Sequence, residues 1–413
     1  MTQTGAGERT GSTQVARSLT EFVGGPNPLA PHYSRFRVTE RTLLTGHSHQ
    51  AWPDVARDAV LEAWDDAAER VDEKWERAAR CAQRVRDGFD ALLGGISGVI
   101  ALGSSTHELV VRFLSALPLA ERPRLVTTDG EFHTLRRQLD RLAEDGRVRI
   151  EKVPALPAAT LAERLAATVD SGTAAVLVSS VLFGNGHVVP ALGELLGACR
   201  QDGVELLIDA YHHLNVLPMS LADDGLEDAF VVGGGYKYCQ LGEGNCFLRV
   251  PADREGMRPI VTGWFSEFAR LAERASGRVE YGEGAERWAG ATYDPTSHYR
   301  AVRVFDFFVE QLLAPGLLRA ISQHQVDVLA RAFDALDADP AVISRDRSVP
   351  LAAIGGFLTL RASRAAEICH ALAARGVHTD FRGDGLRLGP APYLSDRQLE
   401  DAVSALGQVV RAR

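Results

Sequence analysis

Short apolar runs alternate with amphipathic stretches along most of the chain. Between the apolar runs lie helical patterns such as SSTHELVVRFLSAL and HTLRRQLDRLAE. The apolar runs are continuous rather than alternating in polarity, as expected of strands covered by helices on both faces. This order predicts an α/β fold with a mostly parallel sheet sandwiched by helices. The predicted strands are residues 98–102, 124–128, 148–153, 174–181, 204–209, 229–234 and 246–250.

The two ends of the chain have a different texture. Residues 1–30 are rich in Gly, Thr, Ser and Pro without periodicity, which predicts a loose arm. A long helical pattern covers residues 53–93 and ends at two glycines. After residue 315, helical patterns and short strands indicate a smaller C-terminal α+β domain. We therefore expect an N-terminal arm, a large domain and a small domain, at residues 1–40, 41–314 and 315–413.

Composition excludes several classes of protein. The 413 residues are 46% hydrophobic and 24% charged, which are the values of a globular protein. No run of about 18 apolar residues exists, and the N-terminus lacks a basic-then-apolar secretory pattern, so we expect a cytoplasmic protein that spans no membrane. A net charge of −9 disfavours a nucleic-acid partner. The five scattered cysteines predict neither a disulfide framework nor a zinc cluster.

Only three of the 45 basic residues are lysines, so chemistry that needs an amine has three candidates. Lys74 lies in a charge-rich helical pattern and Lys152 at a strand exit, and both positions fit exposure to solvent. Lys237 lies between two tyrosines, directly after a buried strand and the glycines 233–235. Desolvation there would lower the pKa of the amine and favour its neutral, nucleophilic form. Lys237 is therefore the predicted catalytic lysine.

A second candidate feature is a strand-to-helix junction. The 98–102 run leads through Gly103 into Ser104, Ser105 and Thr106, where a helix begins. Free backbone N–H groups, the positive end of the helix dipole and three hydroxyls would then face one point, which suits a phosphate. The simpler interpretation is a serine cap on an ordinary helix. The junction is neither a P-loop nor a G-x-G-x-x-G motif.

A third feature is Asp209, which ends an apolar strand and is followed by His212 and His213. Residues at the carboxyl ends of parallel strands face the ligand crevice of an open sheet. A carboxylate there could hold a protonated ring nitrogen or a metal, or could cap the next turn. Because Asp209 and His212 have no further ligand cluster near them in sequence, we expect no metal site.

These features follow one another as a phosphate cup, a strand-end acid and a lysine 28 residues later. That order resembles the fold-type-I pyridoxal-phosphate enzymes, specifically the class V aminotransferase branch. The resemblance implies that Lys237 binds pyridoxal phosphate covalently and that Asp209 pairs with the pyridinium nitrogen. It also implies a homodimer that acts on an amino acid. Cysteine desulfurases are disfavoured, because Tyr236 rather than His precedes the lysine.

Further motifs, from about residue 43 to the C-terminus, resemble kynureninase. They are LLTGHSHQAWP, DGEFHTLRRQ, DAYHHLNVLP, GGGYKY, TGWF, YDPTS and DFRGDGLRLGPAPYLSD. Leu135 replaces an acid of the family's stacking motif, and an Asp stands where the family has an Asn before a Pro. The implied cofactor contacts are Ser104, Ser105, Thr106, Phe132 (stacking on the ring), Asp209, His212, Tyr236, Lys237, Trp264 and Asp294, and the implied substrate contacts are His47 and Arg387.

The resemblance implies hydrolytic Cβ–Cγ cleavage of a γ-carbonyl amino acid, releasing alanine. Lys237 would act as the base at Cα, Asp209 would keep the ring nitrogen protonated, and Tyr236 would donate a proton. Arg387 would hold the substrate carboxylate. The same site could run β-elimination, transamination or epimerisation. A non-catalytic binding protein is a further alternative. A nicotinamide enzyme is disfavoured, because the glycines 233–235 open no clear helix.

Overall fold

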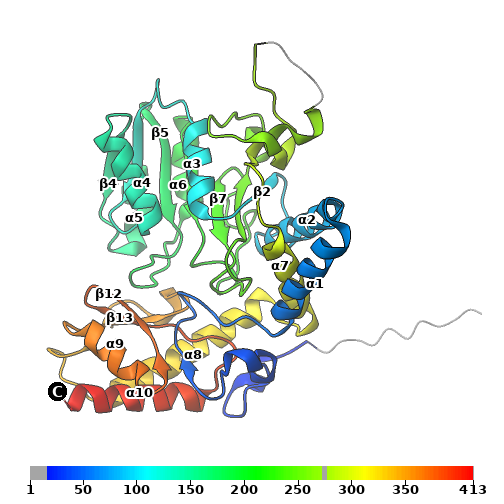
Figure 1. Ribbon diagram of the computed structural model, residues 1–413. Helices are drawn as coiled ribbons and strands as arrows, with labels where there is room; N and C mark the ends of the chain where they lie inside the picture. The colour runs from blue at the N-terminus through cyan, green and yellow to red at the C-terminus, as the bar shows by residue number, and fades with distance from the viewer. Residues whose placement is uncertain (1–15, 272–276, 413) are drawn as a thin grey trace, which may run out of the picture.

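The computed structural model describes residues 16–271 and 277–412. Its centre is a seven-stranded sheet with the order β2-β8-β7-β6-β5-β3-β4 (Figure 1). All seven predicted strands are present, each within two residues of its predicted bounds. They are β2 (Val99–Gly103), β3 (Arg124–Thr128), β4 (Arg149–Val153), β5 (Thr173–Ser179), β6 (Glu205–Asp209), β7 (Phe230–Gly234) and β8 (Cys246–Val250).

The sheet is mostly parallel, as predicted. Strands β3 to β7 are parallel to their neighbours among themselves, whereas β8 pairs antiparallel with both β7 and β2. The exception has a simple cause. Only residues 235–245 separate β7 from β8, too few for the crossover helix that a parallel connection needs. The short return loop contains Lys237, so the change of direction places the lysine at the end of β7.

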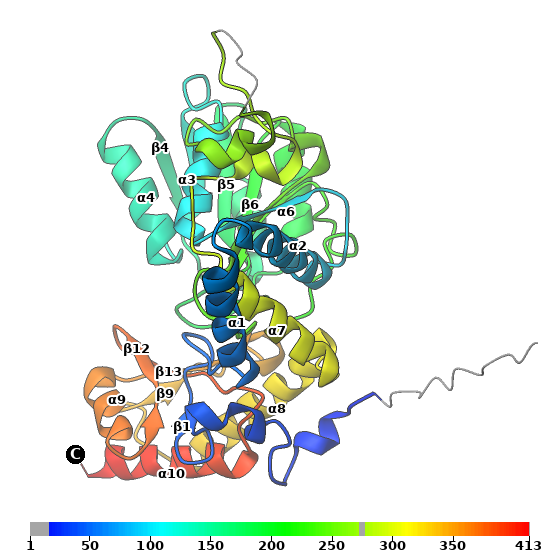
Figure 2. The same cartoon turned by 45° about the vertical axis from the view of Figure 1, so that its right-hand side comes forward.

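Helices cover both faces of this sheet (Figures 1 and 2). Consecutive residues of β5 alternate between two cores. Leu177 packs in the same cluster as α3 and α4, and Val178 in the same cluster as α5 and α6. Both are fully buried, which explains why the strand has no polar face in the sequence. The four helices are α3 (Thr106–Ala116), α4 (His133–Glu144), α5 (Leu161–Ala166) and α6 (Leu192–Gln201).

The long helical pattern before the sheet forms two helices, α1 (Val55–Arg70) and α2 (Lys74–Leu92), so the prediction of one continuous helix is wrong. The chain turns at Val71, whose φ of 50° lies in the left-handed region. The residue types at this turn are compatible with a helix, so the pattern could not reveal the break. Both helices pack on α7 (Thr296–Glu310).

The C-terminal part has its own four-stranded antiparallel sheet, in the order β12-β13-β10-β9. Its helices and this sheet form the lower part of Figure 1. A two-stranded parallel ladder of β1 (Thr42–Leu43) with β11 (Val377–His378) attaches the N-terminal segment to this part. The other elements are α8 (Pro315–Ala335), α9 (Ala365–Ala373), α10 (Asp396–Arg411), β9 (Ser344–Arg345), β10 (Leu358–Arg361), β12 (Asp380–Arg382) and β13 (Gly385–Leu388).

The prediction of a loose arm is wrong for residues 16–30. Residues 1–15 lie outside the described residues. The 3-10 helices η1 (Leu19–Phe22) and η2 (Ala30–Phe36) bury Phe22, Leu29 and Tyr33 in the main core. The Tyr33 hydroxyl donates to Gln240. Scattered apolar side chains thus anchor this N-terminal segment to the core, although its sequence has no helical periodicity. Further 3-10 helices are η3 (Ala158–Thr160), η4 (Ala252–Arg254), η5 (Trp264–Arg270), η6 (Gly284–Trp288) and η7 (Leu351–Ala353).

Within residues 16–271 and 277–412, none of the helices combines the length and apolar character needed to cross a bilayer.

Candidate active site

Lys237 lies on the loop after β7 with only 5% of its surface exposed. Its ammonium nitrogen is surrounded by aromatic rings, at 4.8 Å from the centroid of Tyr211, 4.9 Å from that of Tyr236 and 5.5 Å from that of Phe132. Burial lowers the pKa of Lys237 to about 8, against the opposing pull of Asp209. A substantial neutral fraction of the amine near physiological pH follows, as a lysine nucleophile or base requires.

The glycines before Lys237 serve packing. A Cβ on Gly234 would lie 2.6 Å from both the Cys246 sulfur and the Tyr211 hydroxyl, and a Cβ on Gly235 would lie 2.6 Å from Leu241. None of the three glycines has a positive φ. They let the strand end pass close to neighbouring side chains, and this close packing is what buries the lysine.

Tyr236 is a polar neighbour of the amine, with its hydroxyl 3.4 Å from the Lys237 nitrogen. Burial raises the pKa of Tyr236 to about 12, so the phenol stays protonated and can donate a proton. The ring of His49 stacks on its outer face at 4.9 Å.

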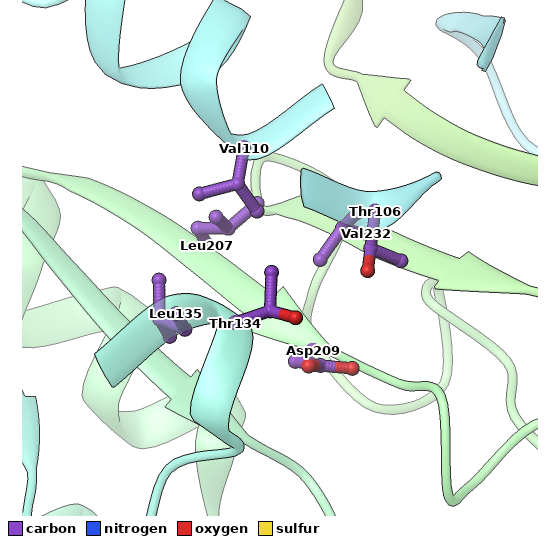
Figure 3. A pocket seen from close by; sticks show the side chains of 7 residues that line it. All are labelled: Thr106, Val110, Thr134, Leu135, Leu207, Asp209 and Val232. Atoms are coloured by element: carbon purple, nitrogen blue, oxygen red, sulfur yellow. The ribbon is translucent and has the colours of Figure 1, made fainter. Parts of the chain in front are cut away.

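Asp209 ends β6 and lines a small hollow (Figure 3). The same hollow is lined by Thr134 of α4 and by Thr106 at the start of α3, so one residue of the predicted phosphate cup lies beside the strand-end acid. The Asp209 carboxylate accepts one hydrogen bond, from the Tyr211 backbone N–H at 2.9 Å. Burial raises its pKa. A buried carboxylate with unused acceptor capacity is well suited to a cationic N–H donor.

Glu131 is a buried acid that sequence reasoning missed. Its carboxylate accepts from the Thr128 hydroxyl (2.6 Å), the Ser179 hydroxyl (2.6 Å) and the Ser179 backbone N–H (3.2 Å). These bonds tie the loop carrying Phe132 to the ends of β3 and β5. Burial raises the pKa of Glu131 to about 7, with the nearby Asp209 acting in the same direction. The sequence signal for Glu131 was an acid that follows a buried strand and directly precedes Phe132, the residue predicted to stack on the cofactor ring.

The phosphate cup (Ser104, Ser105 and Thr106) has the predicted strand-to-helix geometry. Ser105 caps α3 by accepting from the Glu108 N–H at 3.3 Å. Glu108 accepts in turn from the Ser104 backbone N–H (3.1 Å) and hydroxyl (2.8 Å). The serine-cap interpretation therefore describes the bonds that are present, and an anion in the cup would compete with Glu108 for Ser104.

The adjacent residues His212 and His213 have side chains in different environments. His213 contacts the Pro218 carbonyl at 3.1 Å through Nε2. His212 is buried 5.7 Å from the Phe357 ring, and its Nδ1 has no hydrogen-bond partner. Burial, with Lys237 next in effect, holds the pKa of His212 well below its usual value. Of the two, only His212 faces the charges around the lysine.

Arg387 of β13 is 3% exposed and lies beside Asp380 of β12. Its Nε donates to Asp380 Oδ1 at 2.8 Å, Nη2 donates to Oδ2, and Nη1 donates to the Phe183 carbonyl at 2.6 Å. The buried His47 approaches the same carboxylate, with Nε2 at 2.8 Å from Oδ1. Sequence reasoning gave Asp380 no role, although it lies in the motif that suggested Arg387.

Phe357 was also missed. Its fully buried ring lies 4.6 Å from the His47 ring and 5.6 Å from the Arg387 guanidinium carbon. Phe357 therefore packs between the predicted substrate contacts, His47 and Arg387, and the predicted cofactor contact His212.

Two predicted cofactor contacts belong to another segment. Trp264 packs on Phe265 and Phe268, and its indole nitrogen lies 3.3 Å from the Thr292 hydroxyl. Asp294 accepts from the N–H and hydroxyl of Thr296 and so begins α7. Neither residue lines the hollow beside Asp209. Their contact with a phosphate stays a prediction.

Comparison with known proteins agrees with this geometry. Residues 318–406 match the Kynureninase C-terminal domain. The chain is 24% identical to the kynureninase of Bacillus cereus over 329 residues, covering 76% of this chain and 74% of the relative. It is 27% identical to the kynureninase of Xanthomonas euvesicatoria over 384 residues, covering 86% and 87%. The chain is thus similar to kynureninases along most of its length.

Solved structures confirm the fold of this chain. A lysine-to-alanine variant of C-DES, with glycine covalently linked to its pyridoxal-phosphate cofactor, superimposes with a TM-score of 0.80 at 17% identity. The match covers 92% of this chain and 99% of that one. The predicted fold is thereby confirmed. The likeness to kynureninases and to a pyridoxal-phosphate protein of the same fold agrees with the predicted enzyme class and cofactor.

The described residues fit this cofactor. A buried acid with spare acceptor capacity and the start of α3 line the same hollow. The desolvated amine of Lys237 is close enough to that acid for Asp209 to raise its pKa against the effect of burial. Lys237, Asp209, Phe132 and the phosphate cup are the residues that would hold the cofactor aldehyde, ring nitrogen, ring face and phosphate, respectively.

Proposed function

We propose that this kynureninase-like enzyme hydrolyses the Cβ–Cγ bond of an amino acid that carries a γ-carbonyl, and releases alanine. The observation that carries the proposal is the placement of Lys237, buried in an aromatic cage with Asp209 and Arg387 among the charges that set its pKa. When bound, pyridoxal phosphate supplies the electron sink for charge at the substrate Cα.

The residues of the chain would divide the remaining work. The Lys237 nitrogen would take the proton from Cα, because its lowered pKa leaves a substantial neutral fraction. Asp209 would keep the cofactor ring nitrogen protonated. The Tyr236 phenol, protonated and 3.4 Å from that amine, would return a proton to carbon after cleavage. Arg387 would hold the α-carboxylate and so orient Cα.

β-Elimination is a competing reaction that begins with the same proton removal, and a neighbour of known structure gives it a specific precedent. A solved structure with this fold is titled as a cystine C–S lyase, with cysteine persulfide as its product. Its 16% identity supports the fold and leaves the reaction open. Release of alanine from L-kynurenine supports hydrolysis, whereas pyruvate formed from cystine supports elimination. Transamination and epimerisation would form neither product in this way.

We also propose a cytoplasmic homodimer. All five cysteines are free, as suits a reducing compartment. Trp264 and Phe268 expose 43% and 51% of their surface beside one another, which suits a contact with a second copy. Light scattering of the purified protein measures the mass of the assembly.

The first test is the visible spectrum of the protein with added pyridoxal phosphate. We expect a yellow absorption band in the wild type, its loss in Lys237→Ala, and its retention in Lys152→Ala. Lys152 is a matched control, because it is a partly exposed lysine paired with Asp140. With substrate, Lys237→Ala should lower kcat by at least about 10²–10⁴-fold, the usual contribution of a general base. A band that persists in Lys237→Ala contradicts the assignment of the lysine.

A further inference from the structure

Arg387 is held in one orientation by two fixed acceptors. Asp380 takes its Nε and Nη2, and the Phe183 carbonyl takes its Nη1. Asp380 and Arg387 are also direct partners across the β12–β13 ladder, at the edge of the C-terminal part that faces the large sheet (Figure 1). The backbone of Phe183 therefore restrains Arg387, while its ring packs 5.4 Å from Phe132.

A guanidinium has five N–H donors. Three of them are used by Asp380 and Phe183. Each terminal nitrogen therefore keeps one donor, and two donors of this kind can bind both oxygens of a carboxylate. Asp380 occupies the edge formed by Nε and Nη2, which removes the freedom of the guanidinium to rotate and leaves one donor on each terminal nitrogen for a ligand.

His47 contacts the same Asp380 oxygen as Arg387 Nε. Its Nε2 lies 2.8 Å from Asp380, and its Nδ1 is buried without a hydrogen-bond partner. Nδ1 faces Gly389, where a Cβ would lie 2.0 Å away. Burial lowers the pKa of His47 to about 4, so the ring is neutral near physiological pH. Because only Nε2 has an acceptor, the proton resides on Nε2 and is donated to Asp380.

We propose that Asp380, supported by His47, is a positioning residue that directs the free end of Arg387 to the α-carboxylate of the substrate. This inference rests on the proposed function, in which Arg387 binds that carboxylate. It also assigns His47 a role through Asp380. The ion pair between Asp380 and Arg387 thus has two effects. It neutralises a buried arginine, and by occupying Nε and Nη2 it fixes which donors of the guanidinium remain for the substrate.

The experiment compares binding of L-alanine and L-alanine methyl ester to the protein loaded with pyridoxal phosphate, by calorimetry and by the change in visible absorption. The ester lacks the carboxylate but keeps the amine. Wild type should bind the acid at least about 10-fold more tightly than the ester, the usual value of hydrogen bonds to a charged group. Asp380→Asn should remove most of this preference and leave binding of the ester nearly unchanged.

Two controls separate positioning from stability. Asp384→Asn makes the same change on the same hairpin, at an exposed residue paired with Arg361, and should keep the wild-type preference. His47→Leu leaves the ion pair in place but removes the donor, and should lower the acid preference several-fold, whereas His47→Gln should restore part of it. The His47 variants keep the test valid if Asp380→Asn does not fold.

A nitrogen NMR spectrum of the histidine side chains gives a measurement that needs neither the cofactor nor enzymatic activity. We expect His47 as the Nε2–H tautomer in wild type and in Asp384→Asn, and a changed resonance in Asp380→Asn. A wild-type acid-to-ester ratio in Asp380→Asn, or in both His47 variants, overturns the positioning role. Absence of a visible band and of amino-acid binding in the wild type instead overturns the proposed function.

Discussion

The two ends of the candidate site satisfy their polar groups in different ways. On the lysine side, defined by Lys237, Asp209, Glu131 and Arg387, the charged groups are buried. Burial shifts the pKa values of Lys237, Asp209 and Glu131 toward their neutral forms. In the phosphate cup, the Ser104 N–H and hydroxyl are already bonded to Glu108 of the same helix. The lysine side is thus organised in the protein itself, whereas the cup must exchange internal bonds for those to an anion.

This difference predicts which measurements respond to substitution. Changes on the lysine side alter charges in a low-dielectric interior and should affect the reaction strongly. In the cup, which is a partly exposed helix terminus, the cofactor phosphate would only replace Glu108 as the hydrogen-bond acceptor, so substitutions there change less. They should affect mainly the affinity for the cofactor, and by small factors.

Asp209→Asn should have the largest effect of the three substitutions considered next. The amide is nearly isosteric but cannot stabilise a protonated ring nitrogen, so we expect kcat to fall by at least about 10²–10³-fold. Cofactor affinity should fall much less. Steady-state kinetics with L-kynurenine and a cofactor titration measure the two quantities. Asp202→Asn, at an exposed residue after α6, serves as the control and should leave both unchanged. Equal losses of kcat and of cofactor affinity would contradict the proposed difference between the lysine side and the phosphate cup.

Glu131→Gln should alter the pH dependence of stability. The pKa of Glu131 is about 7 in the folded protein, against 4.5 for a free glutamate. Between these values the folded state retains a proton that the unfolded state loses, so this group makes the free energy of unfolding fall as pH rises from about 4.5 to 7. The full effect is on the order of 3 kcal/mol. Glutamine has no such titration.

The measurement is urea denaturation of wild type and Glu131→Gln at the two ends of this pH range. The difference between the two proteins isolates Glu131, because other titrating groups are common to both. We expect the variant to gain stability relative to wild type as the pH rises. A constant difference across the range would mean that Glu131 is ionised throughout and that burial on the lysine side does not control its proton.

The sequence was sufficient for elements that depend on local composition. Continuous apolar runs identified all seven strands of the main sheet, because strands buried on both faces cannot carry polar residues. Lys237 could be selected because the chain has only three lysines, and Asp209 because an acid directly follows a buried strand. The break between α1 and α2 was missed, because it depends on the left-handed φ of Val71 among residues that all tolerate a helix.

Partners that are distant in sequence could not be predicted. Glu131 binds Ser179, 48 positions away, and His47 binds Asp380, 333 positions away. Each bond depends on how the sheets are arranged, and no local pattern records it. The same holds for Glu108, whose side chain turns back to Ser104. From the sequence, Glu108 is one more acid in the first turn of a helix.

Glu108→Gln should have the smallest effect and tests the cup directly. The ionised carboxylate lies at the end of α3 where the phosphate would bind; burial acts to raise its pKa, but Arg112 and Ser104 hold it below the usual value. Removing one negative charge near a helix N-terminus should strengthen binding of pyridoxal phosphate by roughly 2- to 5-fold, which corresponds to about 0.3–1 kcal/mol. Equilibrium titration with the cofactor measures this change.

Pyridoxal without its phosphate is the matched ligand for Glu108→Gln. It retains the ring and the aldehyde, so its contacts on the lysine side are the same, but it places no anion in the cup. Its affinity should therefore be equal in wild type and variant. If the substitution strengthens binding of both ligands equally, Glu108 acts on the whole site rather than on the cup, and the two ends are less independent than their hydrogen bonds indicate. If it strengthens neither, Ser104 does not contact the phosphate.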